Sequence, residues 1–409
     1  MPKKGPSREE RTWLAVNWLA PLRQSERKPR SHENLADDFA AIYGRRISPK
    51  AVAQAIQQAF SERLISVTQN LAPADYRENK VLARRLCQQF SRLRAAIVVD
   101  SVNPTTDDES HIQAGYALAD HIMAAMPFRN GDRIGIGSGR GVYYTVEALR
   151  ASGKNLSLPD DRDRIQPPES EFGVVILSLM GSLFPYSTRK QEEVLFDSDI
   201  TVARFAQCFD SLVHVRPVSY PIALPADDKL KIIERTWLGS VNYPSMVPTH
   251  CIVGMGLLNE NHRFWKSIRA REKTPTILDP IRQQLDTLVE YIDLVRKRYP
   301  DYWPVGDVCG RMFLVTPPDD IRFPQDQVLI TEKIQKLVDD LNKHLLTVTK
   351  TQLGKVMRSV MLVAPTKLKA AGLHTLLMHP HLRVDVVVTD AAGATALLRM
   401  DRRRAQRNP

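Results

Sequence analysis

Cysteine is scarce in this sequence. The 409 residues include four cysteines, Cys87, Cys208, Cys251 and Cys309, which are far apart and form no C-x-x-C pair. This pattern excludes a zinc site of the paired-cysteine type and a disulfide framework. We expect reduced, mostly buried thiols and no resident metal ion.

Long apolar runs are also missing. No run approaches the ~18 residues of a membrane-spanning helix. The first residues, MPKKGPSREER, lack the apolar stretch of a signal peptide. We therefore expect a cytoplasmic protein that has no membrane contact.

Several catalytic signatures are absent as well. The sequence has no H-E-x-x-H and no P-loop, and Ser138 lacks the glycine two residues before it that a nucleophile elbow needs. The dinucleotide motif G-x-G-x-x-G fails in both frames, because Arg140 or Val142 stands where its last glycine should be. We expect no cofactor.

What the chain does have is a glycine-rich turn. Gly135, Gly137, Gly139 and Gly141 follow a short β-type run, and a helix-like segment comes next. Such a turn can aim backbone N–H groups at an anion such as a phosphate. The alternative is a turn that only packs a strand against a helix.

Positive charge is concentrated at the two ends of the chain. Residues 1–90 hold 16 lysines and arginines against 9 acidic residues, and residues 399–409 hold 5 arginines against Asp401, whereas the rest is neutral. A basic head suggests that it meets a polyanion while the body binds something else. The alternative is a basic terminus that is merely solvated.

The head is expected to begin with two amphipathic helices. The first covers 9–22, with Trp13, Val16 and Leu19 on one stripe. The second starts near Ser31, suited to cap it, and ends at Tyr43-Gly44.

A third helix follows Ser48-Pro49, a strong helix-start signal, and runs to about Phe60. Lys50 and Gln54 lie on its polar face, and a short strand over 64–68 completes the order expected of a winged helix-turn-helix. In that arrangement the helix reads base edges in the major groove while arginines in the turn contact phosphates. We therefore predict DNA contacts by Arg45, Arg46, Ser48, Lys50 and Gln54. A three-helix bundle that only packs or dimerises shares the same apolar pattern.

Beyond a short helix over 81–90 the pattern changes to apolar strands that alternate with helices. The strands are expected within 95–100, 133–137, 173–182, 250–258, 359–367 and 384–392. This alternation predicts a parallel sheet covered on both faces, with ligands at the carboxyl ends of the strands. Arg269 to Pro304 and Thr316 to Lys350 look inserted, with helices around 281–295 and 329–346.

The strand ends carry an ordered set of motifs. They are GIGSGRG (135–141), LMGSL (179–183), VGMG (253–256), VGDVCGRMF (305–313), VAPTKLKA (363–370) and VTDAAGATALL (388–398). In this order they resemble the SorC family of sugar-binding transcriptional regulators, also called the DeoR-like sugar-binding group. The resemblance extends from about Glu33 to Leu398.

The resemblance implies an α/β architecture: an amino-terminal winged helix-turn-helix and a Rossmann-like effector domain related to sugar-phosphate isomerases and deaminases. It also implies a homodimer or homotetramer that alters transcription of a carbohydrate catabolic operon. The corresponding domains are residues 1–72, a linker helix over 73–94, and an effector domain over 95–409. The effector residues that it implies are Gly137, Ser138, Gly139, Arg140, Gly141, Gly181, Gly254, Gly256, Asp307 and Lys369, of which the 137–141 loop and Lys369 would hold the phosphate and Asp307 would accept sugar hydroxyls.

Two departures from the family pattern affect the expected phosphate site. Gly141 stands where the family often has a hydroxyl residue, and Pro365-Thr366 stand where it has Gly-Gly before the lysine. Arg140 could supply the lost contact, because a guanidinium group grips phosphate bidentately, but it could equally recognise a carboxylate. A non-phosphorylated acidic effector thus stays open.

Two other function classes stay open at this point. An enzyme of the sugar-phosphate isomerase or deaminase type would need an acid and a base, for which Asp307, His250 and His262 are the candidates near strand ends. It would leave the basic head unexplained. A DNA-associated structural protein without an effector would leave the strand-end glycines without a role. We expect a regulator that binds operator DNA and a small sugar or sugar phosphate, with no catalytic residue.

Overall fold

The computed structural model describes residues 6–7, 10–11, 13–14, 31–61, 76–100, 107–125, 128–152, 156, 173–181, 197–209, 213–218, 220, 222–225, 227–228, 247–258, 278–318, 321 and 323–407. The chain divides into two compact units, a head over Met1–Ala72 and a body over Pro73–Pro409. Each unit has a hydrophobic core of its own.

The head is helical in its described part. Residues 10–11 and 13–14 are helical, and α2 (His32–Tyr43) and α3 (Pro49–Ser61) follow. Ser31 caps α2 by accepting the Asn34 N–H at 3.2 Å, and α2 ends at Gly44 in the left-handed conformation. The predicted strand over 64–68 and the stripe residues Val16 and Leu19 lie outside the described residues.

Aromatic and aliphatic side chains hold these helices together. The head core consists of Leu14, Leu35, Ala36, Phe39, Val52, Ala55 and Ile56, with Trp13, Tyr43 and Ile47 packed against it. Trp13, Phe39 and Tyr43 contact one another, with ring centroids 4.7 to 6.3 Å apart. The apolar residues of the second and third predicted helices therefore pack into one core.

The body is built on a sheet that is mainly parallel, as the sequence predicts. Its central order is β2 (Ala95–Asp100), β10 (Val386–Asp390), β9 (Ser359–Val363), β6 (His250–Leu257), β3 (Arg133–Ile136), β4 (Val174–Ser178) and β5 (Val213–Arg216), all paired in parallel. The strands β2, β9 and β10 are almost wholly buried, which explains their continuous apolar sequences, whereas the edge strand β5 is partly exposed.

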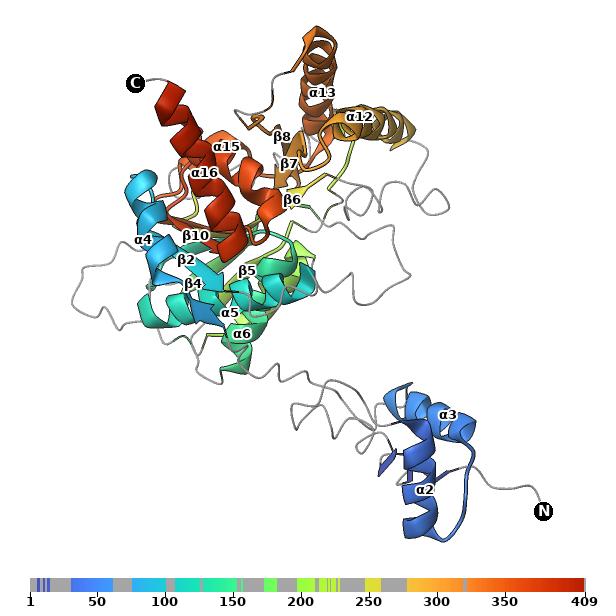
Figure 1. Cartoon of the computed structure of the whole chain (residues 1–409). Coiled ribbons are helices and arrows are strands. Elements are labelled where there is room, and N and C mark those ends of the chain that lie inside the picture. The colour runs from blue at the N-terminus through green and yellow to red at the C-terminus, as the bar shows by residue number, and fades with distance from the viewer. Residues whose placement is uncertain are drawn as a thin grey trace. The chain divides into compact units, whose positions relative to one another are not determined.

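Helices cover both faces of this sheet (Figure 1). One layer contains α5 (Asp107–Ala125), α6 (Arg140–Ala151) and α8 (Ser198–Ala206). The other contains α4 (Lys80–Gln89), α15 (Ala370–Met378) and α16 (Ala391–Arg407). Because α4 buries Ala83 and Leu86 in the main core, together with its C-cap residue Phe90, it is part of the body.

The second half of β6 belongs to an antiparallel ribbon. The first half of the strand, His250–Gly254, pairs with β9, whereas Met255–Leu257 pair with β7 (Val305–Val308), which in turn pairs with β8 (Arg311–Leu314). Two long helices, α12 (Asp279–Arg298) and α13 (Gln325–His344), pack on each other, and α13 packs against β8. The short α14 (Lys350–Gly354) leads into β9. The strand expected within 250–258 is therefore confirmed as β6, and it changes partner between Gly254 and Met255.

The segment that enters the body is anchored at one edge of the sheet. β1 (Arg77–Glu78) pairs antiparallel with the last residues of β2, Arg77 opposite Asp100. The Tyr76 hydroxyl donates to the carboxylate of Asp120 on α5, and the Asn79 side chain donates to Asp100 at 3.0 Å. The first residues of the body are thus fastened to the carboxyl end of β2 and to α5.

Candidate anion-binding site

The glycine-rich turn lies where the direction of the sheet topology reverses. From β3 the chain proceeds outward through β4 to β5, and it then returns to β6 on the other side of β3. In open α/β sheets this switch point opens a crevice at the carboxyl ends of the strands, where ligands bind. Gly137 directly follows β3 and donates its N–H to the Ile252 carbonyl of β6 at 2.9 Å. The turn therefore borders the crevice.

Close backbone approach explains the glycines of this turn. Gly139 has a φ of +116°, which L side chains rarely adopt. A Cβ on Gly137 would lie 2.8 Å from Cys309 Sγ, and one on Gly141 would lie 2.5 Å from Val363 Cγ1. At Gly137 and Gly141 the backbone can lie this close to its neighbours only because glycine has no side chain.

The turn opens α6, whose first residue is Arg140. The first N–H groups of an α-helix have no acceptor within the helix, and they carry a partial positive charge. Gly139 at the N-cap has no side chain that could cap them. This end of α6 has the character of an anion site, and the partly exposed Arg140 adds a positive charge.

Lys369 meets a histidine that the sequence motifs do not include. Lys369 ends the short 3-10 helix η4 (Lys367–Lys369) after β9, and its Nζ lies 2.9 Å from Nε2 of His111 on α5. His111 is only 5 % exposed. Its Cδ2 lies 4.0 Å from the position of a Cβ on Gly141. Residues from α5, α6 and η4 therefore meet at the carboxyl edge of the sheet.

Asp390 is a second buried group at this edge, and it lies within the motif VTDAAGATALL, to which the sequence assigned no role for this residue. It ends β10 and accepts the N–H groups of Gly393 at 2.7 Å and Thr366 at 3.1 Å. Burial raises the pKa of its carboxyl group, against the lowering effect of these N–H groups and of the Lys369 charge. An aspartate directly before a helical sequence is the signal of a helix N-cap, which could have found it.

The loop between β9 and η4 is held by Asp390. Thr366 has a φ of 89°, an unusual value for a residue with a side chain, and its N–H is bonded to Asp390 Oδ2. In the family pattern a glycine occupies this position. Here the backbone donor of the loop is thus directed at a carboxylate of the protein.

The other glycines implied by the resemblance are packed against backbone. A Cβ on Gly254 would lie 3.0 Å from the Ser138 carbonyl oxygen, so β6 and the glycine-rich turn are in contact. A Cβ on Gly181 would lie 2.7 Å from the Tyr220 carbonyl oxygen. Ser138 is partly exposed beside the turn.

Asp307 lies on the antiparallel ribbon. It stands opposite Gly256 in the β6–β7 pairing, and its carboxylate accepts the Gly310 N–H at 3.0 Å. Cys309 and Gly310 both have positive φ, as a tight turn between β7 and β8 requires. Asp307 therefore has a structural role in this turn, next to the role as sugar ligand that the resemblance implies.

The histidine considered for acid–base chemistry lies at the opposite edge. His250 is the first residue of β6, and its Nε2 lies 3.4 Å from Asp132 Oδ2. Asp132 also accepts from Arg358 at 2.9 and 3.1 Å, and Phe128 packs edge-on against the His250 ring. His250 is thus remote from the glycine-rich turn. His262 lies outside the described residues.

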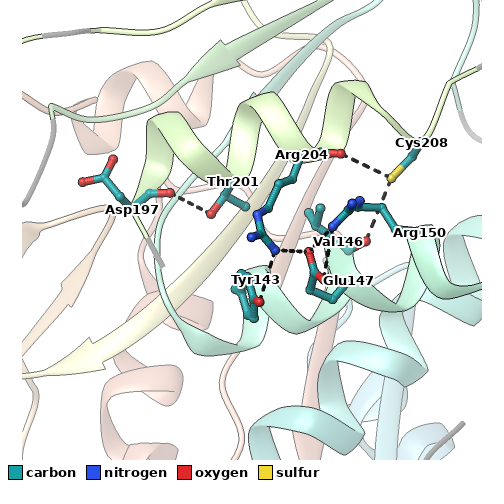
Figure 2. A network of polar contacts seen from close by, with 8 residues as sticks. All are labelled: Tyr143, Val146, Glu147, Arg150, Asp197, Thr201, Arg204 and Cys208. Carbon is teal, nitrogen blue, oxygen red and sulfur yellow. Dashed lines mark hydrogen bonds and ion pairs between the residues drawn. The ribbon is translucent and has the colours of Figure 1, made fainter. Parts of the chain in front are cut away.

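A polar network fixes α6 against α8 (Figure 2). The Arg204 guanidinium donates to Glu147 Oε1 at 2.7 Å and to the Tyr143 hydroxyl at 3.3 Å, and Arg150 donates to the same carboxylate at 2.9 Å. Burial and the Glu147 charge raise the pKa of Tyr143. The helix whose first turn borders the crevice is therefore held along its length.

The third helix of the head presents a polar surface. Ser48 caps α3 by accepting the Ala51 N–H at 3.2 Å, Val52 and Ile56 are buried, and Lys50 and Gln54 are exposed. The side chains of 57–61 lie outside the described residues. The described part of α3 thus has the buried and the exposed face that a groove-binding helix needs.

The two arginines before α3 have different environments. Arg45 forms an ion pair with Glu10 and lies over the Phe39 ring, 5.5 Å from its centroid. Arg46 pairs with Asp37 at 3.2 Å, but both side chains are exposed, at 80 % and 67 %. Arg45 is therefore part of the structure of the head, whereas Arg46 points to solvent.

Comparison with known proteins identifies the fold. No protein-family model and no curated protein matches the sequence. Solved structures do match, among them a domain of a possible sugar-binding transcriptional regulator from Arthrobacter aurescens TC1, with 15 % identity and a TM-score of 0.50, covering 78 % of this chain and 97 % of that one. The two proteins share their fold.

Two further matches are regulators as well. The full-length sorbitol operon regulator SorC from Klebsiella pneumoniae has 17 % identity and a TM-score of 0.47, covering 95 % of this chain and 99 % of that one. A DeoR family transcriptional regulator from Listeria monocytogenes has 16 % identity and a TM-score of 0.47, covering 78 % and 98 %. Regulators of the SorC and DeoR families are thus among the structural neighbours of this chain, as the motifs predicted. At sequence identities this low, the likeness concerns the fold alone.

The described residues also bear on two other kinds of site, a metal site and a membrane span. Within them, no three or more His, Cys, Asp or Glu side chains are placed to hold a metal ion. No helix in the described part of the chain is long and apolar enough to cross a membrane.

Proposed function

We propose that this protein is a DNA-binding transcriptional regulator whose operator binding is modulated by an anionic sugar-like effector, and that it controls a carbohydrate catabolic operon. One observation carries the proposal: Lys369, with its His111 partner, and the glycine-rich turn gather at the carboxyl edge of the sheet, in a chain that has a separate basic head. The regulators among the structural neighbours agree with it.

The DNA half of the proposal belongs to the head. In a winged helix-turn-helix the second helix of the motif enters the major groove and the turn before it meets the phosphate backbone. We propose the groove position for Lys50 and Gln54, which are exposed on α3, and the phosphate position for Arg46 before it. Because helix-turn-helix proteins usually read paired half-sites, we propose a homodimer or homotetramer.

The effector half belongs to the crevice at the switch point. The departures from the family pattern change which groups could contact an anion there. Val363 fills the space beside Gly141 where the family carries a hydroxyl residue, and the Thr366 N–H is bonded to Asp390. An anion would therefore be held chiefly by Lys369 and the first turn of α6, and sugar hydroxyls would lie toward Gly254 and Asp307. The proposal assigns no catalytic residue, and the relation to sugar-phosphate isomerases that the resemblance implies would concern the fold of the body alone.

A ligand screen with a matched pair of variants tests this site. Sugars, sugar phosphates and sugar acids are added to the full chain, and the melting temperature is recorded. We expect anionic sugars to raise it and uncharged sugars not to do so. Lys369→Ala should lose the rise, whereas Lys367→Ala, an exposed lysine on the same short helix, should retain it.

Two results would contradict the proposal. One is that Lys369→Ala keeps the full rise with an anionic sugar. The other is that an effector identified in the screen leaves the affinity for operator DNA, selected from genomic fragments, unchanged in a binding titration.

A further inference from the structure

His111 lies outside all of the sequence motifs. It lies in the first turns of α5, it is 5 % exposed, and its Nε2 is 2.9 Å from the ammonium nitrogen of Lys369. A lysine ammonium group has three donors and no acceptor. A charged Lys369 can only donate here, which assigns Nε2 as the acceptor in this contact and Nδ1 as the nitrogen that carries the hydrogen of a neutral ring.

The contact between these two side chains depends on the charge of the imidazole ring. A neutral imidazole can share a short contact with an ammonium group, whereas an imidazolium beside the same ammonium group would be repelled. An anion between the two reverses the preference, because both groups can then donate to it. The first turn of α6 is adjacent, since a Cβ on Gly141 would approach His111 Cδ2 to 4.0 Å.

We propose that His111 is a ligand of the anion site and binds in its protonated form. On binding, Nε2 takes up one proton from solvent, its contact with Lys369 is given up, and the new N–H donates to the anion. The proposal rests on the proposed effector site and specifies its ligand. Two side-chain cations and a helix N-terminus match a dianionic head group, such as a phosphate or sulfate monoester, better than a single carboxylate.

The charged surroundings of His111 are those of its own helix and of the elements packed against it. Charged residues on these elements include Glu109 on α5, Lys369 on η4, Asp390 at the end of β10, Asp100 at the end of β2, and Arg140 at the start of α6. Of these, Lys369 is in direct contact with the imidazole.

Inorganic sulfate is the probe for the test. It stays a dianion at every pH from 6 to 8, so that a change in its affinity over this range comes from the protein. Binding to the full chain is measured by calorimetry at pH 6, 7 and 8, with ionic strength held constant by sodium chloride. Because the bound state holds one more proton, we expect the affinity to rise as the pH falls, by at most about tenfold per pH unit.

Two variants on the same helix make the test specific. His111→Gln keeps an acceptor near Lys369 but cannot take up a proton, so we expect weaker binding that no longer varies with pH. His121→Gln, which removes another partly buried histidine of α5, should retain the dependence of the wild type. Nitrogen-15 spectra of the wild-type histidine rings at pH 7 give a readout without any substitution, since sulfate should convert His111 from a neutral to a protonated pattern.

The outcomes separate the role of His111 from the site itself. If Lys369→Ala abolishes sulfate binding while wild-type affinity does not vary with pH and His111 stays neutral, the anion site stands and the role of His111 is overturned. If Lys369→Ala leaves sulfate binding intact, the proposed site itself fails, and this inference fails with it.

Discussion

The contact between Gly141 and Val363 gives a prediction whose size follows from the geometry. A Cβ on Gly141 would lie 2.5 Å from Val363 Cγ1, whereas carbon atoms pack at about 3.5 to 4.0 Å, so that the alanine variant requires a shift of about 1 Å or more. Replacing a helical glycine by alanine stabilises by ~1 kcal/mol, and overpacking a tight core costs ~1–3 kcal/mol. We expect Gly141→Ala to lower the free energy of unfolding by about 0–2 kcal/mol.

Val363→Ala is the matched partner. It removes two buried methyl groups, which we expect to cost about 2 kcal/mol. In the double variant the new methyl group occupies space that the valine has vacated, so the two costs should not add. We expect a coupling energy of about 1–3 kcal/mol in the favourable direction. Urea unfolding of the wild type, both single variants and the double variant measures it.

The variant series also reports on the site. If the costs add within about 0.5 kcal/mol, Val363 does not press on the first turn of α6, and the explanation for glycine at this position is wrong. If they couple as expected, Gly141→Ala alone should also weaken sulfate binding, because the shift moves the N–H groups of that turn.

The head gives two further predictions, both measured by titrating operator and scrambled DNA at two salt concentrations. Arg46→Ala should weaken binding to both DNAs alike and reduce the slope of log affinity against log salt concentration by about 1. Arg45→Ala should mainly lower the melting temperature of the head, because Arg45 contacts Glu10 and Phe39. Equal loss of DNA affinity in both variants, without loss of stability, would contradict this division. Gln54→Ala should keep the affinity for scrambled DNA and lose ~1–3 kcal/mol of preference for the operator. If the ratio of the affinities for operator and scrambled DNA does not change, another residue recognises the bases.

The elements that could be predicted from sequence are those with a strong local signal. The strand over Ala95–Asp100 and the helix start at Ser48-Pro49 agree with the structure, because continuous apolar runs and capping residues act locally. The helix α5 was not predicted. It is buried on most of its surface, between the sheet and α6, so its sequence has no polar stripe that would reveal a helical period.

The candidate site shows the same division. Its glycine-rich turn and Lys369 could be found from motifs. His111 could not, since an isolated histidine has no pattern and reaches Lys369 only through a contact 258 residues away in sequence. The extent of β6 could be predicted from its apolar run, but its change of partner from β9 to β7 could not, because a local sequence does not reveal which strands pair.

The anchoring of β1 and Tyr76 has a consequence for signal transmission. The chain that arrives from the head is fastened to the last residue of β2 and, through Tyr76, to Asp120 on α5. His111 lies on that same helix, nine residues earlier, which at 1.5 Å per residue is about 14 Å along its axis. A helix moves as a stiff rod over such a length. If the proposed binding of an effector displaces His111, we expect α5 and the Tyr76–Asp120 hydrogen bond to carry the displacement to the first residues of the body without a deformation of the sheet.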